Sequence, residues 1–284
     1  MKREYSLLDG GLATALEDLG NTFTSELWTG ELLKSAPDQI RDAHAAFVKA
    51  GAEIIITSTY QVSFPGCISK GWTHDEVVDA LKLSVQLARD AKSPLVAASI
   101  GPYGAFLADG SEYRGNYEAS EDEIREFHKE RLEILIATQP DYLAIETIPE
   151  IREAKVLLQL LKNLNNTIPV WIAFSCKDEL RLSSGEYFKD AAKLSKELGA
   201  DYVGINCTSP ELVAGLLESA KEYGPFVVYP NAGRTWNEKL KRLEGATVKL
   251  SDRHIQQWVN CGATIIGGCC GIGPKEIAQV SLAS

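Results

Sequence analysis

Hydrophobic residues along the chain fall into short continuous runs, separated by longer segments in which apolar and polar residues mix. Such runs, rich in valine, isoleucine and leucine, are typical of parallel strands buried on both faces, because half-exposed strands alternate between apolar and polar residues. They predict eight strands: YSLLD (5–9), EIIIT (53–57), LVAASI (95–100), YLAIE (142–146), VWIAFS (170–175), YVGIN (202–206), FVVYP (226–230) and TIIGG (264–268).

The segments between these runs carry apolar residues at helical spacing. The segment 37–51 begins with Pro37 and ends with Gly51, the residue types favoured at the first position of a helix and just after its end. A later segment opens with Ser120 and Glu123, which is the spacing of a capping box. We therefore predict amphipathic helices between the strands.

The junction from helix to strand recurs along the chain. KAGAEIII, ELGADYVGI and NCGATII each place Gly-Ala between a helical segment and an apolar run. Eight strands that alternate with helices in a chain of 284 residues predict a single-domain (β/α)8 barrel, or TIM barrel, over residues 1–284. An open doubly wound sheet is the alternative, but no G-x-G-x-x-G motif follows the first strand.

Composition and charge narrow the range of partners. Hydrophobic residues make up 45% and charged residues 24% of the chain, the net charge is −10 and the pI is close to 5.0. An acidic chain without a basic stripe is not expected to bind nucleic acid. The N-terminal sequence MKREYSLLDGG has no long apolar stretch, so we expect no signal peptide, no membrane partner and a cytoplasmic protein. The oligomeric state stays open.

Polar and thiol residues follow the predicted strands at their carboxyl ends, where the active sites of such barrels lie. In chain order these residues are Asp9 to Gly11, Thr57 to Gln61, Gly101 to Tyr103, Glu146 and Thr147, Ser175 and Cys176, Asn206 and Cys207, Pro230 and Asn231, and Cys269 and Cys270. Because the parallel strands of a barrel all end on one rim, we expect these side chains to face a common site.

Three of the six cysteines stand where a metal ion could bind. Cys207 follows the sixth strand, Cys269 and Cys270 follow the eighth, and one strand lies between. Three thiolates leave one position of a tetrahedral zinc ion free, as in catalytic sites. Their summed charge outweighs that of zinc, so the site suits activation of a substrate thiol better than hydrolysis. The alternative is that these cysteines are small buried apolar residues.

Seven motifs carry a family resemblance: LLDGGLATALEDLG, ITSTYQVS, SIGPYGAFLADGSEYRGNY, AIETIP, GINC, VVYPNAG and IIGGCC, in this order between residues 7 and 277. Through them the chain resembles the homocysteine S-methyltransferases, in particular the single-domain type that uses S-methylmethionine or S-adenosylmethionine. Two positions depart from the usual family pattern. Gly271-Ile272-Gly273 follows the paired cysteines, and Arg234 follows PNAG.

The resemblance implies a (β/α)8 fold and a Zn2+ ion held by Cys207, Cys269 and Cys270. It also implies transfer of a methyl group from a sulfonium donor to homocysteine, which gives methionine. The expected homocysteine site comprises Asp9, Gly10, Thr57, Tyr60, Glu146 and Asn206, with the two carboxylates near the ammonium group. Cation–π attraction makes aromatic residues candidates for holding the donor. The candidate donor contacts are Trp28, Tyr103, Tyr113, Tyr117 and Asn231, with the segment 107–117 as a candidate lid.

Two other functions stay open at this point. Adjacent thiols could serve as a redox-responsive or zinc-responsive switch on a barrel without enzymatic activity. A zinc hydrolase is the weaker alternative, because such sites seldom consist of thiolates alone. Within the methyltransferase interpretation, the sequence leaves the preferred methyl donor open.

Overall fold

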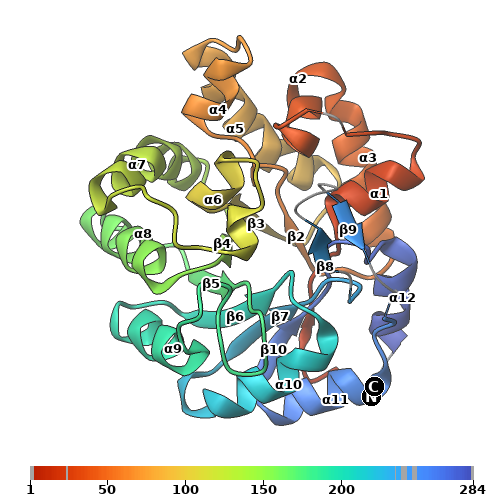
Figure 1. Ribbon diagram of the computed structural model, residues 1–284. Helices are drawn as coiled ribbons and strands as arrows, with labels where there is room; N and C mark the ends of the chain where they lie inside the picture. Colours follow the sequence, from red (N-terminus) through yellow and green to blue (C-terminus); the bar gives the residue numbers. More distant parts are fainter. Residues whose placement is uncertain (1–2, 24, 234, 238–241, 245–247, 283–284) are drawn as a thin grey trace.

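Eight parallel strands form the centre of the molecule, and helices surround them (Figure 1). The computed structural model describes residues 3–23, 25–233, 235–237, 242–244 and 248–282. The strands of the central sheet are β1 (Ser6–Leu7), β2 (Ile54–Ile56), β3 (Leu95–Ile100), β4 (Tyr142–Ile148), β5 (Val170–Phe174), β6 (Tyr202–Asn206), β7 (Phe226–Tyr229) and β10 (Ala263–Ile266). Each one lies within or across a predicted apolar run, so the prediction of eight strands is confirmed.

The strand order is that of a nearly closed barrel. Hydrogen-bonded neighbours follow the order β1, β10, β7, β6, β5, β4, β3, β2. Between the two end strands, Leu8 forms a parallel bridge with Ile54, and the backbone N–H of Asp9 donates to the carbonyl oxygen of Ile54 at 3.0 Å. The predicted (β/α)8 architecture is therefore confirmed, and all eight strands end on the same rim.

The helices lie outside the strands and follow the expected alternation. They are α1 (Leu12–Asp18), α2 (Leu32–Ser35), α3 (Pro37–Lys49), α4 (Phe64–Ser69), α5 (His74–Asp90), α6 (Tyr103–Phe106), α7 (Glu121–Ala137), α8 (Ile151–Asn163), α9 (Phe188–Glu197), α10 (Pro210–Ser219), α11 (Asp252–Asn260) and α12 (Pro274–Leu282), with short 3-10 helices η1 (Trp28–Glu31), η2 (Ser111–Tyr113) and η3 (Lys221–Tyr223). The two helical predictions are confirmed: α3 begins at Pro37, and Ser120 with Glu123 forms the capping box of α7.

The apolar core has two parts because the strands are buried on both faces. The larger part fills the space between the strands and the helices. The smaller part fills the barrel interior, where the indole N–H of Trp171 donates to the hydroxyl of Tyr229 at 3.1 Å. Burial on both faces explains why the strands read as continuous apolar runs.

One pair of strands was not predicted. A two-stranded antiparallel pair, β8 (Thr235–Asn237) and β9 (Arg242–Glu244), follows β7. Strands of three residues are too short to show a periodic pattern in the sequence. Arg234, one of the two departures from the family pattern, lies outside the described residues. None of the helices in the described part of the chain has the length and apolar character that crossing a membrane requires.

Candidate metal and substrate site

Three thiols meet at the carboxyl-terminal rim of the barrel. The Sγ atoms of Cys207, Cys269 and Cys270 all lie within 4.8 Å of one another. The Sγ atom of Cys270 is 3.6 Å from that of Cys207 and 4.0 Å from that of Cys269. A tetrahedral zinc ion with Zn–S distances of about 2.3 Å needs sulfur atoms about 3.8 Å apart. The cluster therefore has the donor type and the spacing that zinc requires.

Strand β7, which lies between β6 and β10, holds the two cysteine segments together. The N–H of Cys207 donates to the carbonyl oxygen of Tyr229 at 3.2 Å, and the N–H of Cys269 donates to that of Pro230 at 2.8 Å. The Asn231 side-chain amide donates to the carbonyl oxygen of Cys207 at 3.0 Å. Cys207 has a positive φ of 47°, a strained conformation that these contacts stabilise.

Glycines after β1 allow the turn that carries Cys269 and Cys270 to approach closely. The N–H of Gly11 donates to the carbonyl oxygen of Ile272 at 2.9 Å. A Cβ atom added at Gly10 would lie 2.3 Å from that same oxygen, and one at Gly11 would lie 2.6 Å from the carbonyl oxygen of Cys269. Glycine is required wherever two backbones approach this closely. The departure Gly271-Ile272-Gly273 thus packs against the start of α1, with Ile272 buried.

The thiol cluster favours one negative charge. Hydrogen bonds from the thiols of Cys269 and Cys270 hold the pKa of Cys207 well below its usual range. Hydrogen bonding to Cys207, together with burial, raises the pKa of the other two thiols. The hydroxyl of Tyr113 also donates to the Sγ atom of Cys207, at 3.6 Å. The contacts within the cluster therefore favour the charged form of Cys207 over those of Cys269 and Cys270.

Asp9 is a buried carboxyl group at the end of β1. It is 2% exposed, and its Oδ2 atom accepts a hydrogen bond from the backbone N–H of Ile56 at 2.9 Å. Its Oδ1 atom is buried and has no hydrogen-bond partner among the described residues. Burial raises the pKa of Asp9 well above its usual range, and the nearby charge of Glu146 adds to this effect. A buried acceptor without a donor is costly, so this position suits a ligand that donates hydrogen bonds or carries positive charge.

Glu146 is the second buried carboxyl group, within β4. Its Oε1 atom accepts a hydrogen bond from the hydroxyl of Ser99 at 2.5 Å. Burial raises the pKa of Glu146 to about 7, and the charge of Cys207 raises it further, while hydrogen bonds with Ser99 and Tyr229 lower it. The structure thus places two carboxyl groups and a thiolate close enough to influence one another's charge.

The remaining candidates for the homocysteine site are linked to their neighbours. Thr57 accepts a hydrogen bond from the backbone N–H of Ser99 at 3.0 Å. The amide of Asn206 forms two hydrogen bonds of 2.7 Å with Thr147, one with its backbone N–H and one with its hydroxyl. Thr147 has a positive φ of 59° and bonds the buried hydroxyl of Tyr60. Asn206 therefore positions the residue after Glu146.

The candidate donor contacts separate into two groups. Tyr113 and Asn231 touch Cys207, as described above. Tyr103 and Tyr117 belong to an aromatic cluster, with ring centres 5.5 Å apart, and the hydroxyl of Tyr117 bonds the carboxylate of Glu153 on α8. Trp28 packs edge-on against Phe23, with ring centres 6.4 Å apart. The described contacts of Trp28, Tyr103 and Tyr117 thus do not involve the thiols.

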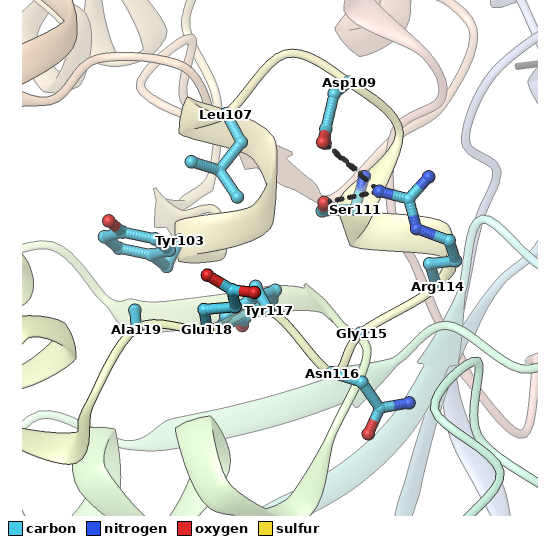
Figure 2. Close-up of a pocket in the computed structure, with 10 residues that line it drawn as sticks. All are labelled: Tyr103, Leu107, Asp109, Ser111, Arg114, Gly115, Asn116, Tyr117, Glu118 and Ala119. Carbon is cyan, nitrogen blue, oxygen red and sulfur yellow. Dashed lines mark hydrogen bonds and ion pairs between the residues drawn. The ribbon is translucent and has the colours of Figure 1, made fainter.

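A cavity of about 360 Å³ lies along the candidate lid, lined by Tyr103, Leu107, Asp109, Ser111, Arg114, Gly115, Asn116, Tyr117, Glu118 and Ala119. Figure 2 shows Arg114 pairing with Asp109 and Ser111 at one end and Tyr103 at the other. Arg114 and Asp109 thus pair with each other at this cavity.

Sequence reasoning missed Glu112, the residue before Tyr113. The Oε2 atom of Glu112 is buried without a hydrogen-bond partner among the described residues. Burial raises the pKa of Glu112 to about 7, and the charge of Cys207 contributes to this shift. Glu112 lies beyond the end of β3, so it is not among the residues that directly follow a strand, which were the positions considered in the sequence. Its position next to Tyr113, a candidate donor contact, was the only feature of the sequence that could have indicated it.

Comparisons with known proteins agree with this geometry. The sequence profile of the family described as homocysteine S-methyltransferase matches residues 6–283. Homocysteine S-methyltransferase 1 of Zea mays is 39% identical over 300 residues, covering 97% of this chain and 93% of the relative. Homocysteine S-methyltransferase YbgG of Bacillus subtilis (strain 168) is 39% identical over 293 residues, with the same coverage.

A solved structure is similar over the whole chain. The metallated form of the homocysteine methyltransferase MmuM from Escherichia coli superimposes with a TM-score of 0.88 at 34% identity, covering 100% of this chain and 97% of that protein. The profile match and the near full-length relatives confirm the resemblance that the motifs indicated. The chain belongs to the homocysteine S-methyltransferase family.

Proposed function

We propose that this protein transfers a methyl group from a sulfonium donor, S-methylmethionine or S-adenosylmethionine, to homocysteine and so forms methionine. The observation that carries the proposal is the convergence of three thiols at the rim of the barrel. When bound, a zinc ion would supply a position at which the homocysteine sulfur stays a thiolate at neutral pH. Cys207, Cys269 and Cys270 would hold it. Membership in an enzyme family disfavours the non-enzymatic thiol switch.

The two buried carboxyl groups bind the amino acid part of homocysteine in this proposal. The unpartnered oxygen of Asp9 and the carboxylate of Glu146 face a ligand whose ammonium group donates hydrogen bonds. Binding of a cation lowers the pKa of both groups and favours their charged forms. Asn206 and Tyr60 act through Thr147, which they hold beside Glu146.

The transfer itself neutralises two opposite charges. The homocysteine thiolate forms a new S–CH3 bond while the bond between the methyl carbon and the sulfonium sulfur breaks. The electron pair of the broken bond stays on the donor sulfur, which becomes a neutral thioether. Exclusion of water favours a step in which charge disappears. The segment 107–117, which places Tyr113 against Cys207, covers the thiols and performs this exclusion.

Metal content and activity of two variants test the proposal. Cys207→Ser is expected to lose bound zinc and homocysteine-dependent methyl transfer together. Cys261→Ser is the matched control, because Cys261 lies at the end of α11 and its thiol contacts Glu218 instead. The wild-type protein, with its zinc content measured, is assayed with S-methylmethionine, S-adenosylmethionine and betaine. Methyl transfer without zinc, or no transfer from either sulfonium donor, would contradict the proposal.

A further inference from the structure

Glu112 is the carboxyl group beside the thiols that the proposed mechanism leaves without a role. It lies in η2, in the middle of the lid segment. The hydroxyl of Ser175 donates to its carbonyl oxygen at 2.7 Å, and Gly104 packs so closely that an added Cβ would lie 2.8 Å from the backbone nitrogen of Glu112. The backbone of Glu112 is therefore fixed from two sides.

The side chain of Glu112 lies near groups that oppose its charge. Its Oε2 atom is buried without a hydrogen-bond partner in the described part of the chain. The charges of Cys207 and Asp109 oppose its ionisation, whereas a hydrogen bond from its own backbone N–H and the charge of Arg114 favour it. Arg114 itself pairs with Asp109 at 3.2 Å (Figure 2). A partly buried carboxyl group with one unpartnered, buried oxygen thus precedes Tyr113, whose hydroxyl contacts Cys207, while the nearby cation Arg114 pairs with Asp109.

A cationic ligand would relieve this unfavourable arrangement. The proposed reaction brings two positive charges to the site: the ammonium group of homocysteine, which Asp9 and Glu146 accommodate, and the sulfonium centre of the donor. Glu112 directly precedes Tyr113, whose hydroxyl lies 3.6 Å from the Sγ atom of Cys207, and its charge contributes to the raised pKa of Tyr60. The donor must present its methyl group to a sulfur bound beside Cys207, so its sulfonium centre lies on this side of the site.

We propose that Glu112 contacts the sulfonium centre of the methyl donor and makes the site prefer the cationic donor over its neutral thioether product. This inference rests on the proposed function. Methyl transfer removes the positive charge from the donor, so the attraction to Glu112 ends with the reaction and the thioether is released. Glu112 stabilises the bound donor more than the transition state, in which the charge is already reduced.

The kinetic consequence is an effect on KM rather than on kcat. Glu112→Gln keeps the shape of the side chain and removes its charge. We expect the KM for the sulfonium donor to rise about tenfold, the size of one charge-assisted contact, while kcat does not fall and the KM for homocysteine is unchanged. Glu118→Gln is the control, because Glu118 is an exposed carboxyl group directly after the segment 107–117. A rise in the KM for homocysteine with an unchanged KM for the donor would overturn the inference.

A direct binding measurement distinguishes the contribution of the sulfonium charge to affinity from that of the rest of the donor. Titration calorimetry without homocysteine measures the Kd of S-methylmethionine and of methionine, its thioether product, on zinc-loaded protein. Glu112→Gln is expected to weaken S-methylmethionine about tenfold and methionine less than twofold. Equal weakening of both ligands, or of neither, overturns the inference.

A second variant keeps the test decisive if Glu112→Gln binds less zinc. Glu112→Asp retains the charge and is expected to keep the preference for S-methylmethionine over methionine; loss of that preference would overturn the inference. Because the titration needs no turnover, an inactive wild-type protein would contradict the proposed function, whereas an unchanged ligand preference in Glu112→Gln would contradict the role of Glu112 alone.

Discussion

Replacing Glu153 by glutamine is expected to remove a pH dependence of stability that originates far from the thiols. Glu153 is fully buried on α8. Its Oε1 atom accepts a hydrogen bond from the backbone N–H of Tyr103 at 2.6 Å and lies 2.7 Å from Nε2 of His128, while Oε2 bonds the hydroxyl of Tyr117. Nδ1 of His128 accepts from the guanidinium of Arg131 at 2.7 Å. This network connects α6 and the last residue of the segment 107–117 to α7 and α8.

The expected magnitude follows from the pKa of Glu153. Burial raises this pKa from 4.5 to about 8, although the N–H of Tyr103 lowers it. Between these two values the folded protein binds more protons than the unfolded chain, so the free energy of unfolding decreases as pH rises. Each unit of pH in this window removes at most about 1.4 kcal/mol, or roughly 4 kcal/mol between pH 5 and pH 8. Glutamine keeps the acceptor oxygen and its amide can donate to Tyr117, but it does not titrate.

Urea unfolding at intervals between pH 5 and pH 8 measures the effect. Wild-type protein and Glu153→Gln are expected to have similar free energies of unfolding at pH 5, and the variant is expected to be more stable at pH 8. Glu133→Gln, which changes an exposed carboxyl group of α7, serves as the control and should follow the wild-type profile. A difference between wild type and Glu153→Gln that does not vary with pH would refute the reasoning.

Three further outcomes are expected. Asn206→Ala removes two buried hydrogen bonds to Thr147 and should lower the free energy of unfolding by about 2–4 kcal/mol; a loss below about 0.5 kcal/mol in urea unfolding would show that Thr147 finds other partners. Gly10→Ala places a Cβ against the carbonyl oxygen of Ile272, in the turn that carries Cys269 and Cys270. The displaced turn should weaken zinc binding at least tenfold in a chelator competition. An unchanged zinc affinity would contradict the close approach of the two backbones. His44 is buried without a hydrogen-bond partner among the described residues, and burial lowers its pKa from 6.5 to about 4. Between pH 6.5 and pH 4 the unfolded chain therefore binds more protons than the folded protein, which destabilises the wild type. His44→Leu removes this effect and should be more stable than wild type by about 2 kcal/mol at pH 5, with no gain from this cause at pH 8. Equal stabilisation at both pH values in urea unfolding would argue against the titration of His44.

The sequence by itself determined the architecture and the position of the thiols. Continuous apolar runs report burial on both faces, which in an alternating βα chain means a parallel barrel. Because parallel strands of one barrel end on one rim, Cys207 and the pair Cys269 and Cys270 had to approach one another once the barrel closed. The motifs around these positions were specific enough to indicate the family.

The tertiary structure alone decided which other polar groups lie near the thiols and which pack elsewhere. Tyr103 and Tyr117 resemble donor contacts in the sequence, but they pack with the buried network around Glu153. Asn206 binds Thr147, one oxygen of Glu112 is buried without a partner among the described residues, and Arg114 pairs with Asp109. Hydrophobic periodicity reports which face of a strand or helix is buried, but it carries no information about the path of an irregular loop. The direction of each loop side chain depends on contacts with segments far away in the chain, and these form only when the whole barrel has packed.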